Sequence, residues 1–371
     1  MLARLLLLGG LVAFAVGVLC GHQRETWSIV LVNHLFWFGL AQGGVAWAAT
    51  LQLARARWSR PVNEVGLAFV AYLPLATLSG ALLYFGRESL LPWLGQDLGD
   101  RAGWLSVPFL FARDAGGTVA LTVLSIVLVR CSARAARERE DGLGHGRDVS
   151  ALSIALLLSY VLVFTLISFD LVMGLKPFWH STLFGLYFIS GAMLAAMAAM
   201  LLALRFLGAR PDSRWHMAPS QWLDASNLLL TFVMLTTYMF FAHLLGIWYA
   251  DLPAETVFLT DRWHSPVWRP VVVFVMAGFL MVPFLLLTVR ELKQRPRLMV
   301  YVAALVLVSA FVERYLLVVP SLFGGRAPFG FVGVFVTLGY AGAFVLSLAW
   351  YLNRTQPASS HAGDEGTLPG V

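Results

Sequence analysis

Charged residues are scarce in this chain. Asp, Glu, Lys and Arg together make up 12% of the 371 residues, whereas soluble proteins average about 25%. Hydrophobic residues make up 59%, and the mean hydropathy is +0.77. A water-soluble surface cannot be built from this composition. A soluble globular domain is therefore excluded, and an integral membrane protein is predicted.

Cysteine and lysine are also nearly absent. The two cysteines, Cys20 and Cys131, lie at the ends of different apolar segments, which excludes a disulfide, a CxxCH haem-attachment motif, an iron–sulfur motif and a thiolate metal site. Lysine occurs only twice, so 24 of the 26 basic residues are arginine. Most of these arginines cluster between apolar stretches, which is typical of membrane topology rather than of nucleic-acid binding. We expect no nucleic-acid partner.

Ten stretches are long and apolar enough to cross a bilayer, since a spanning helix needs about 20 apolar residues. They are 2–20, 27–53, 64–86, 104–130, 151–175, 181–208, 220–250, 267–290, 298–320 and 329–352. The predicted fold class is an all-α integral membrane protein with about ten transmembrane helices. No signal-peptidase motif precedes Cys20, so the first stretch is expected to remain as a span. Segment 87–103 is too short and polar to span and is expected to be an external interfacial helix.

Basic residues are distributed unevenly among the loops. The two ends of the chain and the even-numbered loops hold 17, the odd-numbered loops hold 7, and 2 lie inside spans. By the positive-inside rule, both termini and the even loops are cytoplasmic. We expect a multi-pass protein of the bacterial cytoplasmic (inner) membrane.

The spans predict a single polytopic membrane domain, residues 1–352, followed by a disordered cytoplasmic tail, 353–371, that is rich in Pro, Ser, Gly and Thr. Spans two to five (27–175) and six to nine (181–320) can be laid over one another as two four-helix bundles, flanked by spans one and ten. This is the arrangement of duplicated membrane folds, although no strong sequence repeat accompanies it.

Seven ionisable side chains interrupt the apolar spans. Such residues cost about 2.5–3.5 kcal/mol each on insertion scales, so each is a candidate functional residue. At 1.5 Å per residue, each lies roughly 9–15 Å inside the external end of its helix. They are His34, Arg113, Asp114, Asp170, His243, Glu313 and Arg314.

The pairing of these groups can be predicted in part. Adjacent residues on a helix do not face each other, so Glu313 and Arg314 are not expected to pair within one helix. The predicted pairs are Arg113 with Asp170 in the first bundle and Glu313 or Arg314 with His243 in the second. Two hypotheses stay open: the groups are interhelical ion pairs that hold the bundle in register, or at least one cluster lines a pocket or proton path open to the external face.

Histidines at similar depth could also ligate a b-type haem. His34 and His243 meet that condition, but one histidine in each bundle is a poor arrangement for two axial ligands. We therefore expect no bound haem. His180, beside Trp179 at the start of span six, is expected to hydrogen-bond at the membrane interface.

One segment resembles a known family. Residues 169–191, FDLVMGLKPFWHSTLFGLYFISG, resemble a hairpin motif of the NrfD-like membrane subunits, and the match is closest to the ActF-type subunits of Alternative Complex III, a quinol:cytochrome c oxidoreductase. Leu171 and Gly174 stand where the motif has Trp and Ser. Other matching stretches follow in the family's order along essentially the whole chain: NHLFWFGLAQGGVAWAATLQL (33–53), RPVNEVGLAF (60–69), PFLFARDAG (108–116), IWYADLPAET (247–256) and PFLLLTVRELKQRP (283–296).

The resemblance implies a fold of ten spans with two four-helix bundles and no cofactor bound by the subunit itself. It implies quinone or quinol as the substrate. It also implies a lipid bilayer and the other subunits of a membrane complex as partners: an iron–sulfur protein and a multihaem cytochrome c on the external side, and a second NrfD-like subunit. The positions that match the family's motif are Asp170, Trp179, His180, Ser181 and Thr182 in the hairpin and Arg113 in span four.

Together these features predict a membrane subunit of a respiratory quinol:electron-acceptor oxidoreductase, which anchors its redox partners and carries a quinone-facing or proton-conducting site. Quinol oxidation needs a proton acceptor beside the headgroup, and Asp170 or His34 has suitable chemistry. The predicted catalytic residues are Asp170, His34 and Arg113. The predicted proton path or second cluster consists of Asp114, His180, His243, Glu313 and Arg314.

The rival hypothesis is a secondary transporter, in which the charged clusters bind substrate or couple protons. Against it, no span shows the paired Gly- or Pro-broken helices expected at a transporter's central site.

Overall fold

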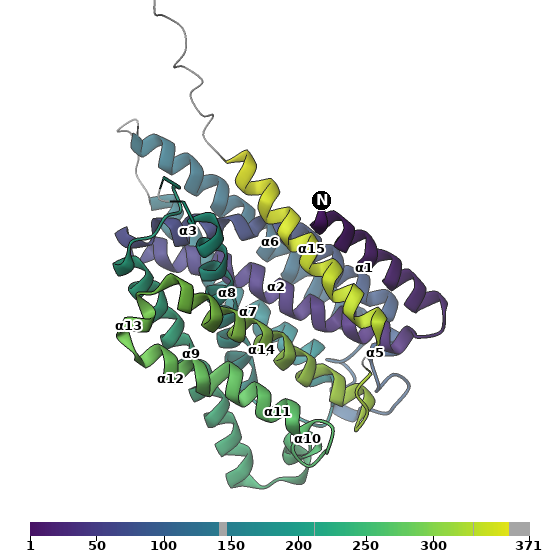
Figure 1. Ribbon diagram of the computed structural model, residues 1–371. Helices are drawn as coiled ribbons and strands as arrows, with labels where there is room; N and C mark the ends of the chain where they lie inside the picture. The colour runs from purple at the N-terminus through teal and green to yellow at the C-terminus, as the bar shows by residue number, and fades with distance from the viewer. Residues whose placement is uncertain (141–146, 211, 329, 356–371) are drawn as a thin grey trace, which may run out of the picture.

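The structure is a computed structural model, and it describes residues 1–140, 147–210, 212–328 and 330–355. Within these ranges every regular element is a helix and no strand occurs (Figure 1). Ten helical segments are long and apolar enough to cross a membrane. The described part of the chain is therefore all-helical, with ten helical segments suited to a multi-pass membrane protein, and the predicted fold class is confirmed at this level.

Eight of the ten spans are built on single α-helices, each close to its predicted stretch. They are α1 (Leu2–Leu19), α2 (Gln23–Leu53), α6 (Val107–Glu140), α7 (Arg147–Leu171), α8 (Phe184–Leu207), α9 (Pro219–Ala250), α14 (Pro296–Phe323) and α15 (Phe331–Arg354). Helix α6 continues to Glu140, well past the predicted end at 130. Helix α15 reaches Arg354, inside the predicted tail, whose residues 356–371 lie outside the described part of the chain.

The third and eighth spans are interrupted helices. The third span consists of α3 (Arg60–Ala68), the 3-10 turn η2 (Phe69–Tyr72), α4 (Leu73–Leu82), the 3-10 turn η3 (Leu83–Gly86) and α5 (Arg87–Leu90). The eighth span consists of α11 (Arg269–Val275), the π-helical turn η6 (Met276–Met281) and α12 (Val282–Thr288). Pro74 and Pro283 closely follow η2 and η6. Each lacks the N–H that would bond the carbonyl four residues earlier, so the helical pattern changes there. These two breaks were not predicted, and they occupy different positions in the two proposed bundles.

Five short elements connect the spans: η1 (Arg57–Ser59), η4 (Gly99–Arg101), η5 (Met173–Leu175), α10 (Pro253–Trp263) and α13 (Arg290–Lys293). The prediction of one interfacial helix over 87–103 was wrong, because only α5 and η4 are helical there. Gly95 and Gly99 adopt positive φ angles of 80° and 54°, a conformation that interrupts a right-handed helix.

Helices α2 and α8, the first spans of the two proposed bundles, lie at the centre of the molecule. In the most apolar segment of each helix, 94% of the residues of α2 and 78% of those of α8 are buried inside the molecule. The corresponding shares are 11% for α1 and 22% for α9. Gly43 allows the two central helices to approach closely, since a Cβ there would lie 2.9 Å from that of Ala196. Trp47 Nε1 then donates to the Met193 carbonyl at 2.9 Å.

Helices α1 and α15 pack against each other in opposite directions. A Cβ at Gly10 would lie 2.5 Å from Gly339 Cα, and one at Gly342 would lie 2.6 Å from the Ala3 carbonyl. The start of α1 and the end of α15 therefore share one end of the bundle. Figure 1 shows α3 and α13 at this end and α5 and α10 at the opposite end, and we call these the α13 end and the α10 end.

The outer surface is strongly apolar. Along α9, Met234, Tyr238, Phe241 and Trp248 are each more than half exposed, and α1 exposes its leucines in the same way. Exposed apolar patches of this extent are unfavourable in water. They match the hydrocarbon core of a bilayer.

Candidate functional site

The predicted pair of Arg113 and Asp170 is present. Arg113 lies two turns into α6, and Asp170 lies in the last turn of the neighbouring α7, both near the α10 end. The guanidinium donates through Nη2 and Nε to Asp170 Oδ2 at 2.6 and 2.8 Å. The Asp170 side chain is fully buried and that of Arg113 is 10% exposed. The prediction that these two charges pair across two helices is confirmed.

Aromatic rings cover this pair. Trp104, in the loop before α6, donates its indole N–H to the second carboxylate oxygen of Asp170 at 3.1 Å. The Arg113 guanidinium lies 3.8 Å from the centre of the Trp104 ring and 4.6 Å from that of Phe109. These cation–π contacts and the indole hydrogen bond hold both charges in fixed positions just below the surface of the α10 end.

A second carboxyl group, that of Asp114, lies beside Asp170. The Asp114 residue is 8% exposed, and its carboxyl group lies within hydrogen-bonding reach of the Asp170 carboxyl but accepts no hydrogen bond from an N–H or hydroxyl group. The Arg113 Nη1 is also unpartnered. One guanidinium thus faces two buried carboxyl groups, and an uncompensated charge is strongly disfavoured at low dielectric. The cluster becomes neutral when the two carboxyls share one proton.

A stripe of uncharged polar side chains leads from Asp114 along α6. The stripe consists of Thr118, Thr122, Ser125 and Ser132. Together with Asp114, these residues lie within about 80° of the helix circumference, and they extend over about 27 Å along the helix axis. Thr118, Thr122 and Ser125 are less than 9% exposed. We call these four residues, with their partners, the polar stripe. The pairs are Thr122–Thr77 at 2.8 Å, Ser125–Gln42 at 3.0 Å, Ser132–Gln52 at 3.2 Å and Gln52–Asn63 at 3.4 Å.

The polar stripe connects the acidic cluster near the α10 end with the α13 end. Its length is close to the roughly 30 Å thickness of a bilayer's hydrocarbon core. It was not predicted, because Ser, Thr and Gln were counted within apolar spans. The signal was available, since residues 114, 118, 122, 125 and 132 are all polar at helical spacing.

His34 lies apart from this cluster. It is 2% exposed, stacks on Phe38 with ring centres 5.6 Å apart, and faces Gly80 of α4, where a Cβ would lie 3.0 Å from the imidazole. Its Nδ1 has no hydrogen-bond partner. Among the described contacts, none joins His34 to Arg113 or Asp170. The structure therefore does not bring the three predicted catalytic residues together.

The hairpin between α7 and α8 brings His180 and His243 close to α10. His243 Nδ1 hydrogen-bonds with Ser181 Oγ at 2.6 Å, and its ring meets the Trp179 ring nearly at right angles. His180 Nε2 lies 3.4 Å from Glu255 Oε1, an ion-pair distance. The predicted contact of His243 with Glu313 or Arg314 does not form in the described contacts, because the hairpin serine occupies that position.

Glu313 and Arg314 correct another prediction, because they do pair within α14. Arg314 Nη1 lies 3.0 Å from Glu313 Oε2, and Nη2 donates to the Phe188 carbonyl at 2.9 Å. The long arginine side chain bends so that its guanidinium contacts both the adjacent Glu313 and the backbone of α8. The Tyr187 hydroxyl lies beside the Glu313 carboxylate. This second pair lies in the centre of the molecule, between α8 and α14.

Arg262 of α10 is a buried cation whose structural role was not predicted. Its Nε donates to the Leu316 carbonyl at 2.9 Å and its Nη2 to Leu317 and Ser321, also at 2.9 Å. Pro320 has no N–H, so the Leu316 carbonyl lacks its usual helical donor. Arg262 supplies it and thereby fixes α10 to α14. Burial lowers the pKa of Arg262 to about 9, so the group stays charged at neutral pH.

The contact of Arg262 with the Leu316 carbonyl predicts that substitutions of Arg262 and Pro320 have non-additive effects on stability. Arg262→Met should destabilise the protein by about 2–4 kcal/mol, because it leaves buried carbonyls unpaired. In a Pro320→Ala background the loss should be clearly smaller, since the substituted residue donates its own backbone N–H to the Leu316 carbonyl. Reversible unfolding in detergent, followed by circular dichroism, gives the four values of the cycle. Strictly additive losses would show that Arg262 does not replace the missing helical donor.

Within the described ranges, no group of three or more His, Cys, Asp or Glu side chains is placed to hold a metal ion. No family model matches the chain, and no curated protein matches it. Function is therefore inferred from the sequence motifs and from the geometry of the acidic cluster.

Proposed function

We propose that this chain is a membrane subunit of a respiratory quinol:electron-acceptor oxidoreductase of the Alternative Complex III type, and that it receives and conducts protons at the cluster of Asp114, Asp170 and Arg113. The observation that carries this proposal is the pair of buried carboxyl groups beside one guanidinium, with the Asp170 carboxyl as the hydrogen-bonding neighbour of Asp114. Intramembrane ionisable groups with this arrangement are typical of proton relays.

The chemistry follows from the groups present. Oxidation of a quinol to a quinone releases two electrons and two protons, and each proton needs an acceptor within hydrogen-bonding reach. The carboxyl pair holds one proton at rest, so it takes the two quinol protons one at a time, each after it has released the proton that it holds, while Arg113 and Trp104 keep Asp170 in place. The polar stripe offers hydroxyl and amide groups for onward transfer. Electrons would leave through iron–sulfur and haem partner subunits, since the sequence carries no haem-attachment or iron–sulfur motif.

The proposal includes the bacterial cytoplasmic membrane and a definite orientation, with the α10 end outside and both termini in the cytoplasm. The uneven distribution of 17 and 7 basic residues supports it. Cys20 is exposed at the α10 end, and Cys131 is half-buried near the α13 end. In intact cells, a membrane-impermeant thiol reagent should label Cys20 and spare Cys131, whereas a permeant reagent should reach both. Preferential labelling of Cys131 by the impermeant reagent would invert the orientation.

A secondary transporter is the second candidate. The helix breaks at η2 and η6 favour it, because transporters place unwound or broken segments at their binding sites. The breaks lie in the third and eighth spans, which are not equivalent in the proposed four-helix bundles, although they correspond when the ten spans are divided into two halves of five.

Purification from native membranes in mild detergent separates the two candidates. The oxidoreductase proposal predicts co-purification with iron–sulfur and multihaem cytochrome subunits, together with quinol-dependent reduction of an external acceptor. A chain that purifies alone and moves a solute in liposomes would contradict the proposal and favour the transporter.

A further inference from the structure

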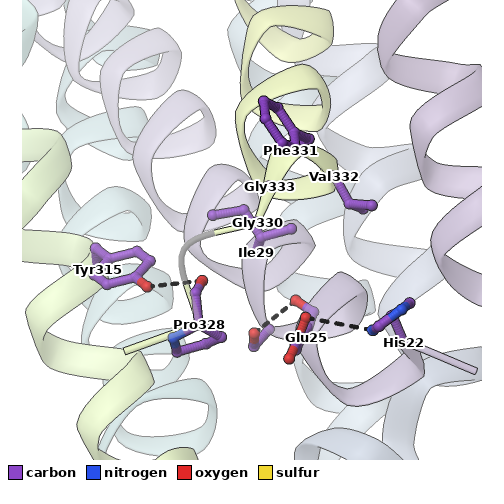
Figure 2. Close-up of a pocket in the computed structure, with 10 residues that line it drawn as sticks. His22, Glu25, Ile29, Tyr315, Pro328, Gly330, Phe331, Val332 and Gly333 are labelled. Carbon is purple, nitrogen blue, oxygen red and sulfur yellow. Dashed lines mark hydrogen bonds and ion pairs between the residues drawn. The ribbon is translucent and has the colours of Figure 1, made fainter. Parts of the chain in front are cut away.

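A cavity of about 220 Å³ opens at the α10 end, away from the acidic cluster. Its walls come from the start of α2, from Tyr315 of α14 and from the start of α15 (Figure 2). These segments are far apart in sequence and meet where three spans end. The hollow exists because Gly330 and Gly333 contribute no side chains, and a Cβ at Gly330 would meet nothing within 4 Å.

The polar lining of this cavity is dominated by hydrogen-bond acceptors. Glu25 is half-exposed, and its one ion-pair contact among the described residues is His22, at 3.7 Å. The Tyr315 hydroxyl donates to the Pro328 carbonyl at 3.3 Å, and Figure 2 shows this contact next to the Glu25 carboxylate. No Lys or Arg side chain lines the cavity. A carboxylate and a carbonyl beside an aromatic ring favour a ligand that is cationic and donates hydrogen bonds.

The position of the cavity indicates where such a ligand comes from. Phe331, which lines the cavity, is 86% exposed, and Leu19, at the end of the neighbouring α1, is 83% exposed. A ligand that reaches Glu25 past these apolar side chains has a polar head and an apolar tail.

We propose that this cavity binds the primary ammonium headgroup of a phospholipid, as in phosphatidylethanolamine. The ammonium donates to the Glu25 carboxylate and to the Pro328 carbonyl and lies against the Tyr315 ring, while the acyl chains lie along Phe331 on the lipid side. A choline headgroup has the same charge but no N–H to donate, and an anionic headgroup is repelled by Glu25. This inference is independent of the function proposed above.

The test uses the full-length chain, delipidated in detergent and titrated with phosphatidylethanolamine while native mass spectrometry counts bound lipids. We expect one saturable phosphatidylethanolamine per chain, with weaker binding of phosphatidylcholine and phosphatidylglycerol. Glu25→Gln should weaken the apparent affinity by about two- to fivefold, the size expected of a half-exposed ion pair. The control Glu88→Gln, at an exposed glutamate of the same end, should bind like the wild type.

Gly330→Phe provides a second variant that does not alter charge. Gly330 has φ −116° and ψ 157°, which any residue adopts, so the new ring can enter the hollow without backbone strain. It should abolish the saturable binding while leaving the melting temperature unchanged. Equal binding by both variants and the wild type would overturn the proposal. So would equal binding of phosphatidylcholine, or binding of free ethanolamine as tight as that of the lipid, which would indicate a site for soluble amines.

Discussion

Asp170→Asn is expected to destabilise the protein by about 3–5 kcal/mol, because it removes the carboxylate that pairs with the buried Arg113 guanidinium. Asp170 is fully buried and accepts three hydrogen bonds, two from Arg113 and one from Trp104. Unfolding in detergent measures the loss, and the yield of assembled complex should fall with it. Asp261→Asn is the matched control, since Asp261 pairs with Lys176 at 3.1 Å with both side chains a third or more exposed, and such pairs contribute at most about 1 kcal/mol.

The double variant Asp170→Asn with Arg113→Gln separates structure from function. Removing both charges should restore much of the stability, because no unpaired charge remains. If the pair has a role in proton transfer, the assembled double variant should still turn over quinol at least about tenfold more slowly, since general acid–base groups contribute about a hundredfold or more. Full turnover in a stable double variant would leave Arg113 and Asp170 as a structural ion pair only.

Unlike Asp170→Asn, Asp114→Asn is expected to reduce quinol turnover without reducing stability. The substitution preserves shape and removes one of two carboxyls that share one guanidinium, so stability should be unchanged or slightly higher. Quinol turnover should fall by about a hundredfold, because the cluster loses its exchangeable proton site. Asp148→Asn, at an exposed aspartate in the first turn of α7, should leave turnover unchanged. A folded Asp114→Asn protein with wild-type turnover would show that this carboxyl takes no part in proton transfer.

Much of the fold could be predicted from the sequence, because a bilayer imposes a simple length and polarity rule. All ten stretches correspond to helical spans, and the seven ionisable residues lie in the half of each helix nearer the α10 end. The pairing of Arg113 with Asp170 followed from the need of each buried charge for a partner on another helix. These predictions depend only on the length and polarity of segments along the sequence.

The features that the sequence did not predict depend on how far long side chains reach and on local backbone geometry. The spacing rule for helices considers Cβ directions, and it does not anticipate that a long Arg314 side chain can bend back to Glu313 while it bonds to the Phe188 carbonyl. The breaks at η2 and η6 depend on how Pro74 and Pro283 redistribute backbone hydrogen bonds. The role of Arg262 depends on a proline more than fifty residues away, which no local pattern shows.

The central claim is that Asp114 and Asp170 hold an exchangeable proton, and infrared difference spectroscopy of the purified complex tests it directly. The resting protein should show the carbonyl stretching band of a buried protonated carboxylic acid, which shifts on transfer to heavy water and changes when quinol is added. The band should be lost in Asp114→Asn and kept in Asp148→Asn. Identical carboxylic-acid bands in the wild type and in folded Asp114→Asn would contradict the account.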